Sequence, residues 1–255
     1  MDFLYLRTLI NNINFYRFTR IFIVCFIALL FFVSARDSQS ATSNDPHYSS
    51  AGFFDIHVCN WPGRPLFFMT LFSTYRFNDI SNIQVFSPDD IMIGELDLSK
   101  FRIITDKNKK EKRVFINQFE IPVNAKNGWY YTKVNFKNNK PIISKDYVII
   151  DNLEITSIST PNLNKELDSI PKSFTWKKVP GAQYYQVFIR DNWDSKLIHK
   201  TKLVKKPELQ LPDNLLKKGG IYSIQIHARD TNEHQLLGDF NHGSLTKQIE
   251  FSIAE

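Results

Sequence analysis

The chain has 255 residues, which is enough for one large domain or for two domains of roughly 100–130 residues each. It contains 22 Phe and 10 Tyr against 9 Gly, and this composition favours β-structure because aromatic side chains fit pleated, half-buried surfaces. The formal net charge is +6, of which residues 1–35 carry +2. The remaining +4 excludes the strongly basic surface of a typical nucleic-acid-binding protein, so we expect no nucleic-acid partner.

The N-terminal region has the pattern of an export signal. Arg17 and Arg20 precede an apolar run over residues 21–33, and the small residues Ser34 and Ala35 follow it. Thirteen helical residues span roughly 20 Å, less than the ~30 Å hydrocarbon core of a bilayer. We therefore interpret residues 1–35 as a cleaved secretory signal peptide. The alternative is an uncleaved signal anchor, in which residues 21–33 hold the protein in the inner membrane.

The cysteine content limits how the exported protein is stabilised. Cys25 lies inside the apolar run after the bulky Val24, a position that does not fit a lipoprotein signal. Cleavage would leave Cys59 as the only cysteine, which excludes an intramolecular disulfide. Each domain must then be stable through its hydrophobic core alone. We expect an exported bacterial protein, periplasmic or extracellular, with membrane contact only if residues 21–33 are retained.

Small polar residues at 36–52 predict a flexible linker, and short apolar runs follow it at about ten-residue spacing. Regular short strands separated by polar turns indicate an antiparallel β-sandwich or barrel. Clear two-residue alternation begins at Tyr130, Tyr185 and Tyr222, with Tyr131 on the face opposite Tyr130. The runs predicted as strands of the first domain are 53–59, 65–77, 82–86, 101–105, 113–119, 129–136 and 146–150.

A weak internal repeat supports two tandem β-sandwiches. Gly128-Trp129-Tyr130 is echoed by Gly220-Ile221-Tyr222, and each Tyr follows a polar turn. The arrangement resembles the tyrosine corner of immunoglobulin-like sandwiches, in which the hydroxyl bonds back to the preceding loop. We place the domain boundary near residues 151–158.

Residues 156–255 resemble a fibronectin type III domain. The resemblance rests on Phe174-Thr175-Trp176, Val179-Pro180-Gly181-Ala182, Tyr185-x-Val187-x-Ile189, Leu209-x-Leu211-Pro212 and Gly220-x-Tyr222-x-Ile224-x-Ile226-x-Ala228. It implies a seven-stranded sandwich in which Trp176 and Tyr185 are core residues and Tyr222 is the corner tyrosine. It implies no chemistry, because such domains serve as spacers, adhesion modules and binding platforms.

Residues 53–155 resemble bacterial immunoglobulin-like modules more loosely. The matching segments are Val85-x-x-Ser87-Pro88-Asp89 and Gly128-Trp129-Tyr130-x-x-Lys133-Val134-x-Phe136, which make Tyr130 the corner tyrosine of this domain. Because no disulfide pair is present, the resemblance to antibody-type domains is limited to topology.

Three groups of reactive side chains are candidate sites. His57 and Cys59 would share one face of a strand, but they lack a recognisable oxyanion hole or orienting group, so we expect a structural cysteine. The remaining two groups are His227, His234 and His242 with Asp230 and Asp239, and Asp89, Asp90, Glu95 and Asp97. Both groups lack the spacing of metal or glycosidase sites, so we expect no bound metal or cofactor there. We expect His227 on the solvated outer face of its strand, His234 and His242 in a solvated loop, and Asp89-Asp90 in a turn.

Two features favour binding. A basic run between two apolar segments predicts a hairpin tip that contacts anionic envelope polymers or phospholipid head groups. The competing interpretation is a simple soluble turn. Trp193 lies in a polar turn, where it could stack on a sugar or anchor a protein, or fold back over its own hairpin. The cationic candidates are Lys107, Lys109, Lys110, Lys112 and Arg113.

These features together predict a non-enzymatic, all-β binding or spacing module of a bacterial cell envelope. Its partner would be an envelope protein or glycan. The alternatives are a carbohydrate-active or other hydrolytic enzyme with an unrecognised site, and a membrane-anchored structural subunit of an envelope complex.

Overall fold

The computed structural model describes residues 45–105, 109–230 and 240–255. The chain divides into two compact units, Met1–Asp45 and Pro46–Glu255. The predicted signal peptide falls in the first unit and lies outside the described residues. Within the described ranges of the second unit, the regular secondary structure consists entirely of β-strands, so the protein belongs to the all-β class.

The first half of the second unit forms two facing antiparallel sheets. One sheet has the strand order β1-β2-β6-β5, and the other has the order β4-β3-β7-β8. The side chains between them, which include Phe54, Phe72, Ile83, Tyr130 and Val134, form a continuous buried core. The strands are β1 (Phe53–Asn60), β2 (Phe67–Thr74), β3 (Ile80–Phe86), β4 (Met92–Glu95), β5 (Phe101–Thr105), β6 (Glu111–Glu120), β7 (Gly128–Phe136) and β8 (Asn139–Val148).

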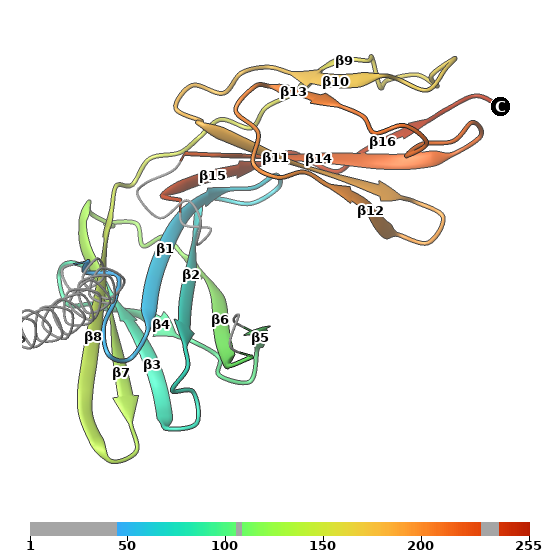
Figure 1. Cartoon of the computed structure of the whole chain (residues 1–255). Coiled ribbons are helices and arrows are strands. Elements are labelled where there is room, and N and C mark those ends of the chain that lie inside the picture. The colour runs from blue at the N-terminus through green and yellow to red at the C-terminus, as the bar shows by residue number, and fades with distance from the viewer. Residues whose placement is uncertain (1–44, 106–108, 231–239) are drawn as a thin grey trace, which may run out of the picture. The chain divides into compact units, whose positions relative to one another are not determined.

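The second half repeats the architecture with a core of its own around Phe174, Trp176, Tyr185, Ile224 and Phe251. A three-stranded sheet, β13-β10-β9, faces the sheet containing β12, β11 and β14, as Figure 1 shows. Two short strands pair with different parts of β14. The strands are β9 (Ile158–Thr160), β10 (Ser173–Trp176), β11 (Tyr184–Asp191), β12 (Lys196–Lys200), β13 (Glu208–Gln210), β14 (Ile221–Arg229), β15 (His242–Leu245) and β16 (Ile249–Ser252).

The two sandwiches are joined through a shared sheet. Strand β15 pairs with β14 on one side and, in parallel, with β1 on the other, with Val58 opposite His242 and Asn60 opposite Ser244. The resulting sheet of nine described strands runs from β12 of the second sandwich to β5 of the first. Backbone hydrogen bonds therefore fix the junction, whereas the sequence predicted two tandem sandwiches with no contact specified between them.

The connection between the sandwiches is held by side-chain hydrogen bonds from both of them. Asn60 Nδ2 donates to Leu153 O at 3.0 Å, and Ser244 Oγ donates to Glu154 O at 2.7 Å. His242 Nε2 lies 2.9 Å from Ile149 O. These bonds satisfy backbone carbonyls in a segment that has no sheet partner of its own.

Residues 46–52, which were expected in the flexible linker, lie against the first sandwich. Lys145 N donates to Pro46 O at 2.8 Å, which extends the edge of β8. His47 Nε2 lies 3.0 Å from Asp146 Oδ1, and Ser49 Oγ lies 2.7 Å from Ser144 Oγ. Ala51 is buried. Polar composition misled the prediction because the small polar side chains here bond to buried polar groups of β8; residues 36–44 lie outside the described part.

Buried tyrosine hydroxyls tie loops to strands in both sandwiches. Tyr130 Oη donates to Lys126 O at 3.0 Å, four residues upstream. Tyr222 Oη accepts from Lys217 N at 2.9 Å. Tyr185 Oη accepts from Val179 N at 2.9 Å, and its ring meets that of Trp176 at 5.4 Å between centroids. Each hydroxyl satisfies a backbone group that strand pairing leaves free.

We expect Tyr185→Phe to lower the free energy of unfolding of the second sandwich by about 1–3 kcal/mol, because the buried Val179 N–H loses its acceptor. Urea unfolding measures this loss. Tyr184→Phe on the same strand is the matched control, and a change within about 0.5 kcal/mol is expected because its half-buried ring faces the other way. Equal losses in the two variants would contradict the role of the hydroxyl.

Candidate functional site

The predicted Cys59–His57 pair lies on the face of β1 directed away from the core of the first sandwich. Both side chains are buried, and His57 Nε2 bonds to Asp55 Oδ2 at 2.6 Å rather than to the thiol. Cys59 packs with Phe67 and Phe240 in a small third core at the junction. Burial, only partly opposed by Arg229 and Arg64, raises the pKa of the Cys59 thiol to about 12. The thiol is therefore protonated and sealed from substrate, which is the opposite of what nucleophilic catalysis requires.

His227 was expected on a solvated outer face, and that expectation is wrong. Its side chain is buried at the junction, where its ring lies edge-on to Phe240 at 5.4 Å. Arg229 Nε donates to His227 Nδ1 at 3.1 Å. Burial, followed by the charges of Arg229 and His57, lowers the pKa of His227 well below 6.5. The outer face of β14 is polar because it forms part of a hydrogen-bonded interface, a distinction that alternation alone cannot make.

His242 belongs to the same junction but has the opposite charge preference. Burial alone lowers its pKa, but the hydrogen bond from Nδ1 to Asp230 Oδ2 at 2.7 Å and the contact with Ile149 O outweigh burial and raise the pKa above 6.5. His242 was expected in a solvated loop and is instead half-buried in β15. His234 and Asp239 lie outside the described residues.

The acidic segment forms turns. Asp97 accepts hydrogen bonds from both the backbone and the hydroxyl of Ser99, and these bonds, with Lys100, lower its pKa to about 2. Asp89 pairs with Lys126, and Asp90 has φ 61° in the turn between β3 and β4. Among the described residues, no group of three or more His, Cys, Asp or Glu side chains is placed to hold a metal ion.

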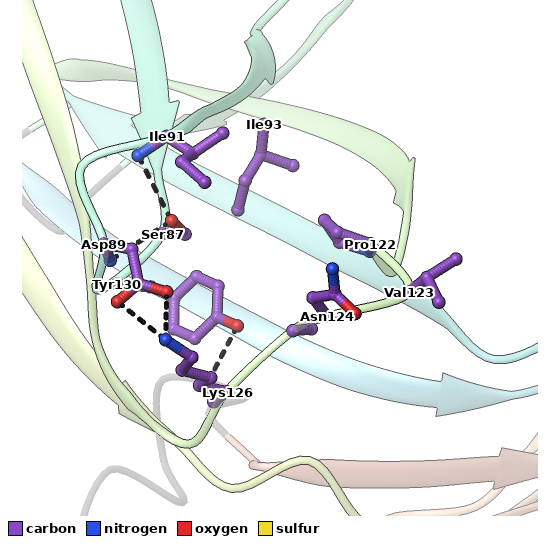
Figure 2. Close-up of a pocket in the computed structure, with 10 residues that line it drawn as sticks. Ser87, Asp89, Ile91, Ile93, Pro122, Val123, Asn124, Lys126 and Tyr130 are labelled. Atoms are coloured by element: carbon purple, nitrogen blue, oxygen red, sulfur yellow. Dashed lines mark hydrogen bonds and ion pairs between the residues drawn. The ribbon is translucent and has the colours of Figure 1, made fainter.

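A pocket of about 720 Å³ opens between the β3–β4 turn and the segment joining β6 to β7 (Figure 2). Its lining includes the apolar side chains of Ile93 and Val123 and the ring of Tyr130. Lys126 Nζ lies 2.9 Å from Asp89 Oδ2, so the carboxylate in this pocket is already paired with a cation. The volume suits a small ligand, but the lining lacks the two opposed carboxylates needed for glycoside hydrolysis.

The predicted basic hairpin is only partly described. Lys107 lies outside the described residues, and Lys109 has φ 60° just before β6. Lys110 Nζ and Lys112 Nζ lie 4.8 Å and 5.6 Å from the ring centroid of Tyr75, and burial lowers the pKa of Lys112. Lys110 and Lys112 therefore lie over the ring of Tyr75, the residue that follows β2, whereas the sequence predicted that the whole basic run projects into solvent.

Strand β5 is one edge of the nine described strands of the shared sheet, and all of its side chains are exposed. Arg113 of β6 lies over the rings of Phe77 and Phe101, at 4.0 Å and 4.1 Å. Ile103 and Ile104 are more than half exposed beside these cations. The edge combines apolar and positively charged groups, but the adjacent residues 106–108 lie outside the described part.

Trp193 is the most exposed aromatic side chain among the described residues, at 79%. It occupies the turn between β11 and β12, and its backbone N donates to Asp191 Oδ1 at 3.0 Å. The ring does not fold back over the hairpin, so it remains available to a partner. The structure does not bring it together with the basic hairpin, which belongs to the first sandwich.

A second aromatic surface was missed in the sequence analysis. Trp129 and Tyr147 are directly paired on β7 and β8, and each is nearly half exposed. Phe86 and Tyr131 are paired on β3 and β7 with their rings stacked. The signal was present in the alternation of β7, where Tyr130 faces the core and its neighbours Trp129 and Tyr131 must face outward.

The fold and these surfaces define an all-β protein built from two β-sandwiches that share one sheet, with aromatic side chains on its outer surface. Among the described residues, no helix is long and apolar enough to cross a membrane.

No family model and no curated protein matches the chain. Among solved structures, it is similar to Tp47, the 47-kilodalton lipoprotein of Treponema pallidum, with a TM-score of 0.40 and 7% identity over 82% of this chain and 52% of that one. A Salmonella alpha-2-macroglobulin matches with a TM-score of 0.26 and 13% identity, over 83% of this chain and 15% of that one. Murine CEACAM1b matches with a TM-score of 0.23 and 11% identity, over 78% and 99%. The chain thus spans about half of Tp47, and similarities this weak carry no functional argument.

We expect Cys59 to resist alkylation by iodoacetamide at pH 8 in the folded protein, because its thiol is buried and its pKa is about 12. Peptide mapping by mass spectrometry distinguishes Cys59 from Cys25. Complete labelling in 8 M urea is the control. Rapid labelling of Cys59 in native buffer would contradict a sealed junction.

Of the histidines at the junction, His227 and His242 have pKa values shifted in opposite directions, and together they predict a stability maximum near pH 6.5. Below that pH, His227 is protonated in the unfolded state but stays neutral in the folded state because it is buried. The free energy of unfolding therefore falls by up to about 1.4 kcal/mol per pH unit. Above it, stability falls as His242 loses the proton that its raised pKa favours in the folded state. Urea unfolding at pH 5.5, 6.5 and 7.5 measures both effects. His227→Gln should flatten the acid side, and an unchanged profile would contradict the assignment.

Proposed function

We propose that this chain is a non-enzymatic, exported binding module of a bacterial cell envelope, recognising a protein or glycan partner through the outer surfaces of its sandwiches. The observation that carries this proposal is the placement of the aromatic side chains. Trp129, Tyr147 and Trp193 are left in solvent, where folding gains little from them, whereas the described thiol and His227 are buried.

The described side chains supply little that a hydrolase would need. Cys59 is protonated and enclosed, and the carboxylate of Asp89 in the pocket of Figure 2 is paired with Lys126. A general acid or nucleophile needs a pKa near the working pH and access to substrate. This contrast favours binding over catalysis.

Two expectations from the sequence complete the proposal. The export of the protein rests on the N-terminal pattern of residues 1–35. The fibronectin type III resemblance of residues 156–255 is supported by strand order, because β9, β10 and β13 face the sheet that contains β11, β12 and β14. Domains of this type commonly present partner-binding surfaces on a stable scaffold.

The proposal is tested by sedimenting the purified full-length protein with isolated bacterial envelopes. We expect saturable binding with no time-dependent release of reducing sugars or peptides. At least one of the single variants Trp129→Ala and Trp193→Ala should weaken binding about tenfold, since exposed aromatic anchors are typical hot spots. Lys218→Ala, another exposed substitution, is the matched control.

Continuous product release during the incubation would identify an enzyme and contradict the proposal. Failure of the protein to bind envelopes saturably would contradict it as well.

A further inference from the structure

At one end, the outward face of the sheet β4-β3-β7-β8 carries two cross-strand pairs of aromatic residues, called the aromatic rows below. The strand register places Trp129 opposite Tyr147, and Tyr131 opposite Phe86. Trp129 and Tyr131 lie two residues apart on β7, a separation of roughly 7 Å along the strand. Tyr130 between them points into the core. The four rings therefore share one face of a continuous sheet.

Contacts within the sheet hold these rings in place. The Phe86 and Tyr131 rings stack at 5.0 Å between centroids with an interplanar angle of 10°. Tyr131 Oη donates to Asp90 Oδ1 at 3.0 Å. Trp129 and Tyr147 meet edge to face at 5.3 Å and 76°. Rings fixed in this way lose little conformational entropy when a ligand covers them.

Amide side chains follow the aromatic rows on the same face. Asn135 lies opposite Asn82 on β3, and Lys133 lies opposite Gln84. Asn135 Nδ2 donates to Asn82 Oδ1 at 2.5 Å and reaches Gln84 Oε1 at 3.5 Å. Gln84 Nε2 also lies 3.8 Å from Met92 Sδ. The network orients donors and acceptors before any ligand arrives.

The charges of the face are balanced. Lys133 and Lys145 are exposed on β7 and β8, and Glu95 and Asp90 lie at β4 and its preceding turn. Phosphate polymers and nucleic acids require an excess of cations, which this face does not provide. A neutral, hydroxyl-rich ligand complements such a surface.

We propose that this face binds the pyranose rings of a polysaccharide. A pyranose ring has an apolar C–H face that stacks on aromatic rings and a rim of hydroxyl groups that bond to amides and charged side chains. The aromatic rows would supply the stacking platform, and Gln84, Asn135 and Lys133 would bond the hydroxyls. This inference names the ligand class of the proposed binding module and rests on that function.

The architecture leaves this face available. The junction to the second sandwich uses β1, which belongs to the opposite sheet of the first sandwich. Trp129 and Tyr147 remain 46% and 47% exposed, and Ile143 beside Lys133 is similarly exposed. A flat, open sheet face suits an extended chain rather than a small molecule enclosed in a pocket.

The test is native affinity electrophoresis of the purified full-length protein in gels containing xylan, hydroxyethyl cellulose or glycol chitin, with sedimentation on peptidoglycan sacculi. We expect at least one polysaccharide to retard the protein. Trp129→Ala and Tyr147→Ala should each weaken binding by about tenfold or more, whereas Trp129→Phe retains a ring and should lose less. Lys218→Ala, an exposed substitution in the second sandwich, should bind as the unmodified protein does.

Circular dichroism and urea unfolding establish that each variant is folded. If Trp129→Ala does not fold, Tyr147→Ala tests the role of the aromatic face in polysaccharide binding by itself. Absence of retardation by every polysaccharide would overturn the saccharide assignment, as would retardation that Trp129→Ala and Tyr147→Ala leave unchanged. Binding to an envelope protein through Trp129 without polysaccharide binding would likewise overturn it. In the last case saturable envelope binding persists, so the proposed function survives while this inference fails.

Discussion

The architecture depends on the burial of both faces of strand β1. One face carries Phe54, Ile56 and Val58 into the core of the first sandwich. The other carries Asp55, His57 and Cys59, and a strand with such polar groups is stable only if something satisfies or covers them. His57 stacks on Phe240 at 3.7 Å, and β15 supplies the edge hydrogen bonds. The first sandwich therefore requires the second for a complete surface around β1.

This requirement has consequences for the titratable groups and for the aromatic face of the first sandwich. Because the junction excludes water, a thiol and a histidine that would be candidates for chemistry on an open strand become neutral structural groups, as Cys59 and His227 do. Because the junction occupies the sheet β1-β2-β6-β5, the opposite sheet keeps its outer face open. The same contact thus removes one candidate site and leaves another exposed.

Local sequence patterns predicted most strands of the first sandwich because alternation and turn chemistry are local properties, but they missed β4 and residues 139–145 of β8. Tyr130 and Tyr222 lie in the cores with their hydroxyls bonded to the preceding loops, as the resemblance to a tyrosine corner implied. Tyr185 is a core residue, as the fibronectin type III resemblance implied. Long-range pairing was beyond the sequence, because nothing local to His242 indicates that its strand will meet Val58 in parallel. His227 was misplaced for the same reason: an outward residue can face either solvent or another domain, and period-two alternation is identical in both cases.

The aromatic face illustrates a different limit. Alternation places Trp129 and Tyr131 outward, but their meaning depends on what lies across the strands, namely Tyr147 on one side and Phe86 on the other. A single outward aromatic residue is common on protein surfaces, whereas two registered pairs beside an ordered amide network are a constrained arrangement. The core beneath them is filled by Tyr130, Thr132 and Val134, so these rings are not needed to close it. The proposed polysaccharide would cover this solvent-exposed and ordered arrangement.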